Sequence, residues 1–234
     1  MRLILLQIIV QSVSSTLHWL GIYVGIRALT DQSRQRWWII GSAVVFAAWL
    51  IGIALLATSD VLPPQRVPVT LFATLAVGYL ALLSQTVRAI IANIPQHWLI
   101  GIQTFRVLGG VFLIRYFQGE LPGIFAIPAG VGDVITGVLA PFVAYWWFVG
   151  KPYARTAAIA WNLFGMADLI DAVAIGALTR GAGGGIVFPI ILIPLYAVPR
   201  AFLVHSYSLI GLLKETSRPP KPTESLHYGI AAAS

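Results

Sequence analysis

The apolar residues of this chain gather in seven stretches, each about as long as a lipid bilayer is thick. A membrane-crossing α-helix needs about 20 mostly apolar residues, and the sequence offers them at about 3–28, 37–57, 69–91, 97–117, 129–149, 156–178 and 186–211. Only 10% of the residues are charged, against roughly 25% in a soluble domain, so the surface cannot face water throughout. The sequence therefore predicts an all-α integral membrane protein: a single domain over residues 1–213 that forms a bundle of about seven transmembrane helices.

The basic residues near the span ends predict the orientation of this bundle. Nine of them lie on the side of the C-terminus and four on the side of the N-terminus. Because cytoplasmic loops carry the excess of Lys and Arg, we expect the N-terminus outside and the C-terminus inside, in a bacterial inner (plasma) membrane. Residues 214–234 then form a mobile cytoplasmic tail. The net charge of +7 has the same origin, and no basic cluster is dense enough for nucleic acid.

Two segments are unusual for membrane helices. The stretch 119–130 is apolar but contains Pro122, Pro128 and three glycines, so we expect an interfacial segment or a re-entrant loop rather than a continuous helix. The seventh span carries Pro189, Pro194 and Pro199, and each proline removes a helical hydrogen-bond donor. This pattern predicts either a bent packing helix or a hinge.

Polar residues inside the spans are the most informative feature for function, because an ionisable side chain at the bilayer centre costs about 2.5–3.5 kcal/mol on insertion scales. Such residues should therefore face the interior of the bundle. In the first span they follow one helical face, and in the fourth span Gln103, Arg106 and Gly110 do the same. Others lie in the fifth, sixth and seventh spans. The candidates are Gln7, Gln11, Ser14, His18, Gln103, Arg106, Asp133, Asn162, Asp168, Asp171, Arg200 and His205.

The depths of these residues suggest ion pairs. Arg106, Asp168 and Arg200 come to similar depths, so we expect Asp168 to pair with one of the two arginines. Arg115 and Asp133 both lie toward the outer side and form a second expected pair. Because breaking a buried pair leaves an uncompensated charge, Asp168→Asn alone should destabilise the protein. The alternative is that the polar stripes are only packing seams between helices.

Several kinds of chemistry fit these residues poorly. Haem bound by His18 and His205 needs both histidines at matched depth. A divalent metal at Asp168 and Asp171, as in a membrane-embedded enzyme, lacks a second acidic motif. No cofactor is therefore predicted, although both readings stay open.

The best-supported prediction is a transporter or channel-like protein for a small molecule or ion. Its binding site would use Arg106, Asp133, Asp168, Asp171, Arg200, Asn162, Gln103 and His18. Asp168 and Asp171 would titrate or bind a cation, while Arg106 and Arg200 would act as counter-ions or anion contacts. A ligand-binding or accessory membrane protein is the further alternative. The lipid bilayer is the expected partner, and the oligomeric state is left open.

Overall fold

The computed structural model describes residues 2–29, 31–58, 66–179 and 190–214. All regular secondary structure in these ranges is helical. The α-helices are α1 (Arg2–Arg27), α2 (Gln32–Thr58), α3 (Val67–Leu80), α4 (Gln85–Ala92), α5 (Gln96–Ile102), α6 (Val111–Phe117), α7 (Gly123–Phe148), α8 (Ala154–Leu178) and α10 (Val198–Leu213). Three tighter or wider helical segments join them: the 3₁₀ helices η2 (Ala81–Leu83) and η3 (Gln103–Gly110), and the π-helix η4 (Ile193–Ala197).

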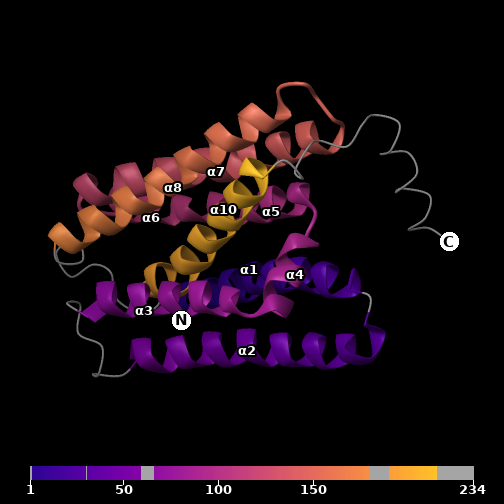
Figure 1. Ribbon diagram of the computed structural model, residues 1–234. Coiled ribbons are helices and arrows are strands. Elements are labelled where there is room, and N and C mark those ends of the chain that lie inside the picture. Colours follow the sequence, from indigo (N-terminus) through magenta and orange to yellow (C-terminus); the bar gives the residue numbers. More distant parts are fainter. Residues whose placement is uncertain (1, 30, 59–65, 180–189, 215–234) are drawn as a thin grey trace.

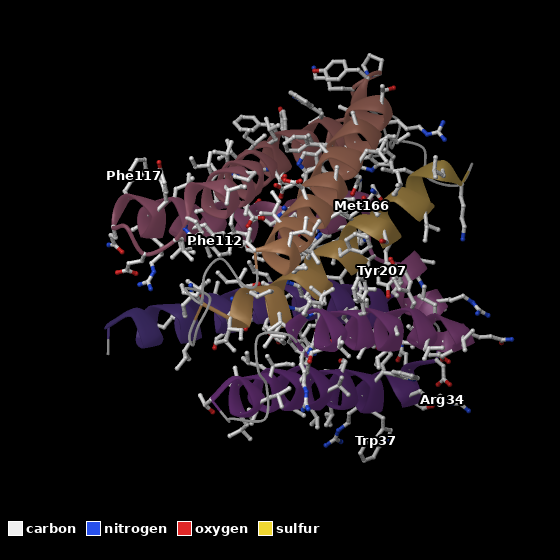
Figure 2. All side chains as sticks on the ribbon, turned by 90° about the vertical axis from the view of Figure 1, so that its left-hand side faces the viewer. Arg34, Trp37, Phe112, Phe117, Met166 and Tyr207 are labelled. Atoms are coloured by element: carbon white, nitrogen blue, oxygen red, sulfur yellow. The ribbon has the colours of Figure 1, made fainter. Side chains whose placement is uncertain are left out.

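The helices form two groups with α10 between them (Figure 1). On one side α7 packs against α8 and against the continuous segment α5–η3–α6. On the other side lie α1, α2 and α3, with α2 outermost (Figure 1). Helix α10 contacts α8 and α5 in the first group and α3 in the second, so it ties the groups together. Figure 2 shows Arg34 and Trp37 of α2 pointing away from the other helices, and Trp37 is 72% exposed.

Four helices are long and apolar enough to cross a membrane: α2, the segment Gln96–Phe117, α7 and α8. The bent pair Val67–Leu83 and Gln85–Ala92 makes a fifth if it counts as one span. The first and seventh predicted spans coincide with α1 and with η4 plus α10. Their crossing of a bilayer stays a prediction, as do the count of seven and the orientation. Residues 215–234 of the predicted tail lie outside the described residues.

The third predicted span, 69–91, is not one straight helix. The chain bends by 96° between η2 and α4, at Ser84, whose backbone is extended. The Ser84 hydroxyl accepts a hydrogen bond from the backbone N–H of Val87 and so caps the new helix. From the first turn of α4, Arg88 donates back to the carbonyl oxygens of Leu82 (2.7 Å) and Leu83 (3.4 Å), two acceptors left free where the first helix ends.

The prediction of a non-helical segment over 119–130 was wrong for most of its length. Helix α7 begins at Gly123, directly after Pro122, and continues through Pro128. Proline is tolerated in the first turn of a helix because the N–H groups there lack partners in any case. Pro128 lies inside the helix, where it removes one backbone hydrogen bond and crowds the carbonyl group of Ile124, a local cost that leaves α7 unbroken. The turn between α6 and α7 is therefore short, and Gly119 supplies its positive φ of 73°.

Two apolar clusters bracket the middle of α7 and α8. One joins Phe112, Phe125 and Ile190, together with Ala172 and Ile175 of α8. The other lies toward the opposite ends of the same two helices. Its members are Ile100, Ala140, Val143, Trp147, Ala154, Ala158, Trp161 and Leu212. The stretch between the two clusters carries the charged residues described next.

Candidate functional site

The local geometry of η3 places Arg106. A 3₁₀ helix has three residues per turn, so residues three apart lie in line along one face. Gln103, Arg106 and Gly109 are accordingly the buried residues of η3. The sequence prediction placed Gly110 on the same face as Gln103 and Arg106, because it assumed an α-helix. In the 3₁₀ helix Gly109 occupies that face instead. Eight residues is long for this helix type, and such stretches often mark a hinge or a site under strain.

Arg106 is 2% exposed and uses every nitrogen of its guanidinium. Its Nε donates to Asp133 Oδ1 at 2.7 Å. One Nη donates to an Asp168 carboxylate oxygen, and the other reaches the carbonyl oxygen of Gly165 at 3.0 Å and His205 Nε2 at 3.1 Å. The predicted pair between Arg106 and Asp168 is thereby confirmed. The planar guanidinium links η3, α7, α8 and α10 at one point.

Three glycines leave the space that this centre needs. A Cβ at Gly132 would collide with the Asp168 carboxylate, and a Cβ at Gly109 with that of Asp133. At Gly165 a Cβ would lie 2.5 Å from the His205 ring. Each glycine thus lets a helix backbone approach a charged side chain closely. The sequence prediction noted glycines in these spans but did not connect them to the charges.

The Arg106 centre carries more negative than positive groups. One guanidinium stands against two carboxylates, Asp133 and Asp168, whose side chains are 14% and 10% exposed. With both carboxylates ionised the centre has a net charge of −1, and an uncompensated buried charge is costly. A bound proton or another cation would cancel it.

A hydrogen-bonded chain leads from Arg106 toward the far ends of α5 and α10. His205 Nδ1 lies 2.9 Å from Asn162 Oδ1. Because Arg106 can only donate to Nε2, the ring proton must lie on Nδ1 and is donated to Asn162. The Asn162 amide donates in turn to Ser208 Oγ at 2.9 Å, and so does Gln96 at 2.5 Å. Asn162 therefore orients His205, and its role as a ligand contact stays a prediction.

Arg200 forms a second buried centre with a different set of partners. Its guanidinium donates to Gln11 Oε1 at 3.2 Å, to Ser14 Oγ at 3.0 Å and to the Tyr196 carbonyl oxygen at 3.1 Å. It also lies 3.9 Å from the centroid of the Tyr196 ring, a cation–π contact. Within the part of the chain that the structure describes, no carboxylate pairs with Arg200.

Tyr196 is a partner that the sequence analysis missed. It belongs to the π-helix η4, and its hydroxyl lies 2.6 Å from Ser15 Oγ. The only signal in the sequence was its place between Pro194 and Pro199, which disturb the helix there. The predicted bend or hinge of the seventh span corresponds to this π-helix.

The histidines do not suit the haem reading. Both ring nitrogens of His205 are engaged, with Asn162 and with Arg106. His18 Nδ1 lies 2.7 Å from the carbonyl oxygen of Ser14 and must donate to it, so the 3.4 Å approach of Arg200 to the same nitrogen is not a hydrogen bond. Of the four ring nitrogens of His18 and His205, only His18 Nε2 has no partner among the described residues, and a single free nitrogen does not make a pair of axial ligands.

Two other predictions need correction. Asp171 is exposed on α8 and does not join Asp168 at the centre, and no cluster of three metal-ligating side chains occurs in the described ranges. Arg115 pairs with Glu120, since Asp133 is held by Arg106. Gln103 donates to the Ala201 carbonyl oxygen at 2.8 Å and so joins η3 to α10, while its Oε1 has no hydrogen-bond partner among the described residues. Its role as a ligand contact stays a prediction.

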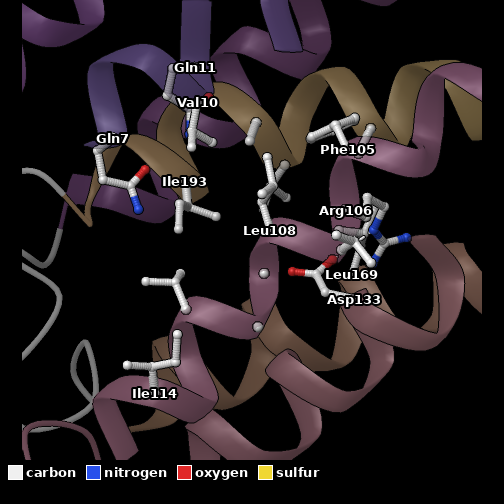
Figure 3. A pocket seen from close by; sticks show the side chains of 17 residues that line it. Gln7, Val10, Gln11, Phe105, Arg106, Leu108, Ile114, Asp133, Leu169 and Ile193 are labelled. Carbon is white, nitrogen blue, oxygen red and sulfur yellow. Dashed lines mark hydrogen bonds and ion pairs between the residues drawn. The ribbon is translucent and has the colours of Figure 1, made fainter. Parts of the chain in front are cut away.

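A cavity of about 300 Å³ lies beside the Arg106 centre. Figure 3 shows Asp133 and Gln7 projecting into it from opposite sides, with apolar residues between them. Gln7 is 3% exposed, and its Oε1 has no hydrogen-bond partner in the described structure. The labelled apolar residues of the wall are Val10, Phe105, Leu108, Ile114, Leu169 and Ile193. Asp168, Asn162, His18 and Arg200 are not part of the lining.

The fold and the site together define a class of protein: an all-helical chain with several helices able to span a membrane and a charged centre buried between them. Within that class the chain belongs to the family described as a domain of unknown function, DUF8737, whose model matches residues 63–213. Neither the curated proteins nor the solved structures contain a match. All side-chain partners of Arg106 lie inside the matched range, whereas α1 and α2 precede it.

Proposed function

We propose that this protein is an integral membrane transporter, or a channel-like protein, that binds an ion or small molecule at the Arg106 centre. The observation that carries the proposal is the pair of carboxylates against one buried arginine, with one of the carboxylates facing a cavity. A purely structural ion pair needs one partner for each charge. The second carboxylate adds a buried negative charge that the stability of the fold does not require. Its presence is explained if the centre binds and releases a cation.

The surface of α1 supports a membrane position for the helices beyond the four most apolar ones. Its polar residues Gln7, Gln11, Ser14 and His18 are all buried. Its opposite face is exposed and apolar, with Ile8, Ile9, Val13 and Leu17 between 37% and 53% exposed. A helix that turns its polar stripe inward and its apolar stripe outward fits a lipid environment. This pattern favours the count of about seven spans.

The two helical segments that depart from α-helical geometry lie next to the buried arginines, which favours a protein that changes conformation at these sites. Arg106 lies in the 3₁₀ helix η3, and Arg200 follows the π-helix η4. Both segments depart from α-helical hydrogen bonding, and such departures occur at hinges and functional sites. A change of winding in η3 would move Arg106 relative to Asp133 and Asp168. Alternating access needs structural elements that move relative to the binding site, and η3 would supply such a movement here.

A metal-dependent enzyme at Asp168 and Asp171 gains no support. Asp168 is paired with a guanidinium, which repels a divalent cation, and Asp171 is exposed away from it. Binding without transport, as in an accessory protein, is an outcome that the experiment can reveal.

The test uses the purified full-length chain in liposomes that contain a pH-sensitive dye. Gradients of protons, sodium, potassium, small amines and small carboxylates are imposed, and internal pH and charge movement are recorded. We expect at least one gradient to drive movement in the wild type and Asp133→Asn to abolish it. The charge-matched control is Asp31→Asn. The hydrogen bond from Ser33 lowers the pKa of Asp31, so this surface carboxyl is ionised at neutral pH.

Absence of any movement in the wild type would refute transport. Equal movement in the wild type and Asp133→Asn would refute the assignment of the site. Loss of movement in Asp31→Asn would show that the measurement responds to surface charge and would also count against the assignment.

A further inference from the structure

We infer that the cavity beside Asp133 binds an organic cation with an apolar body: an amine in its ammonium form, which enters from the hydrocarbon side of the bilayer. The inference rests on the proposed function for the role of the Arg106 centre. It goes further by naming the chemical class of the ligand and its route. It depends on the cavity lining, the free acceptors and the exposed apolar mouth.

The two ends of the cavity offer hydrogen-bond acceptors. Asp133 uses Oδ1 for Arg106, and no described group donates to its Oδ2. Gln7 Oε1 is likewise buried and unpartnered. Figure 3 places these two side chains on opposite sides of the same space. A ligand with N–H donors would satisfy both, and a buried acceptor gains most from a charged donor.

The charge of the site selects the sign of the ligand. Asp133 and Asp168 share one guanidinium, so the centre carries an excess of one negative charge when both are ionised. An ammonium group at Asp133 would cancel it, whereas a carboxylate there would meet like charge. Arg106 cannot serve as an anion contact, because its nitrogens are already committed to Asp133, Asp168, Gly165 and His205.

The walls select an apolar body. Between Gln7 and Asp133 the cavity is lined by aliphatic side chains from α1, η3, α6, α8 and η4. A volume of about 300 Å³ lies at the small end of the range for binding pockets of small organic molecules. An inorganic cation would leave most of this space empty, but an aromatic or aliphatic amine would fill it.

The opening of the cavity at the protein surface indicates that the ligand enters from the lipid. Val107, Leu108 and Ile114 line the cavity and are also 38%, 42% and 57% exposed. They therefore mark where the cavity meets the outer surface of η3 and α6. In a membrane that surface faces acyl chains, which a polar solute does not cross but an amphipathic amine does.

The test measures binding of benzylammonium to the full-length chain in detergent by isothermal titration calorimetry. Three compounds serve for comparison, each with a micelle blank. Benzyl alcohol is neutral, benzoate is an anion, and methylammonium carries the charge without the phenyl ring. We expect benzylammonium to bind at least about tenfold more tightly than the other three. A charged hydrogen bond is worth about that factor against benzyl alcohol and benzoate, and burial of the phenyl ring gives the preference over methylammonium. Equal or tighter binding of benzoate or benzyl alcohol would overturn the inference.

Variants locate the site. Asp133→Asn should weaken benzylammonium at least about tenfold and leave benzyl alcohol unchanged. Leu108→Trp should block the mouth without touching a charge, which keeps the test valid if Asp133→Asn does not fold. Its matched control is Leu163→Trp, at a position on α8 that is 53% exposed and outside the cavity lining.

The outcomes separate the two proposals. If benzylammonium binds through Asp133 but no gradient drives movement, the ligand class stands and transport is wrong. If movement depends on Asp133 but benzylammonium does not bind, transport stands and the ligand class is wrong. Unchanged binding in Leu108→Trp would also overturn the inference.

Discussion

Arg106 and Arg200 are equally buried, each 2% exposed, but the chain compensates their charges in opposite ways. Arg106 faces two carboxylates, and Arg200 faces only neutral acceptors and an aromatic ring. The first centre has a surplus of negative charge and the second a surplus of positive charge. Summed over both centres, two arginines meet two aspartates, so the charges balance across the bundle although neither centre is neutral alone.

The two centres also differ in where their partners come from. Arg106 takes its partners from α7, α8 and α10, all within the residues that match the family. Arg200 needs Gln11 and Ser14 from α1, which precedes the matched range. The Arg106 centre is therefore complete within the family's own segment, whereas the Arg200 centre depends on an additional helix. Four substitutions test this contrast.

The largest effect should come from Arg106→Met. This change leaves Asp133 and Asp168 as two buried carboxylates without a counter-ion, and removal of one partner from a buried pair costs about 3–5 kcal/mol. We expect little folded protein, measured as the monodisperse fraction in gel filtration and by the thermal unfolding midpoint in detergent. The triple variant that also carries Asp133→Asn and Asp168→Asn should recover much of the loss. A well-folded Arg106→Met protein would contradict the assigned role of the charges.

Gly132→Ala should be next, at about 3 kcal/mol, the upper end of the range for overpacking. The added methyl group would collide with the Asp168 carboxylate and push it off Arg106. Gly52→Ala on α2 is the matched control, because nothing lies within 4 Å of its Cβ. The control should be neutral or slightly stabilising, since alanine favours helices. Equal unfolding midpoints for the two alanine variants would argue against the close packing at Gly132.

Gln11→Leu should cost about 2 kcal/mol, because it takes one acceptor from a buried guanidinium that has no carboxylate to rely on. Gln7→Leu is the control: it lies one turn earlier on the same face of α1, and its Oε1 makes no hydrogen bond. Thermal unfolding of the two variants isolates the interaction with Arg200. A larger loss for Gln7→Leu than for Gln11→Leu would reverse the comparison.

Asp168→Asn should have the smallest effect, within about 1 kcal/mol. The expectation from sequence was a clear loss of stability, since it assumed one carboxylate for each arginine. The structure provides Asp133 as a second partner for Arg106, so the variant leaves a neutral pair and an amide oxygen that still accepts a hydrogen bond. Combined with Asp133→Asn, the loss should become large, because Arg106 then lacks any counter-ion. Additive small losses in a thermal unfolding experiment would show that the carboxylates do not share Arg106.

The comparison shows how far sequence reasoning reaches. Depth alone predicted that Asp168 pairs with Arg106 or Arg200, because the three residues come to similar depths, and the structure shows the pair with Arg106. The pairing of Arg115 with Asp133 failed on the same argument. Depth restricts which charges can meet, but the rotation of each helix decides which ones do. Asp171 illustrates this: it lies three residues from Asp168 but is exposed.

The winding of the helices was the other limit. A period of 3.6 residues groups Gln103, Arg106 and Gly110, whereas the 3₁₀ geometry of η3 groups Gln103, Arg106 and Gly109. The sequence of η3 carries no proline to signal the change. We attribute the 3₁₀ winding to close packing of η3 against α7. The two backbones approach so closely that a Cβ at Gly137 would collide with the backbone of Val107.

By itself the sequence determined that the chain is helical, that several helices are apolar enough for a membrane, and that charges such as Arg106 and Arg200 belong in the interior of the bundle. These follow from composition and spacing, since lipid excludes charge from the outer surface. Only the tertiary structure decided that one arginine holds two aspartates, that the other arginine has no carboxylate partner within the described residues, and that a cavity separates Gln7 from Asp133. Those features depend on helix rotation, on local winding and on which glycines face a neighbouring side chain. The glycines themselves can be read from the sequence, but what they face cannot.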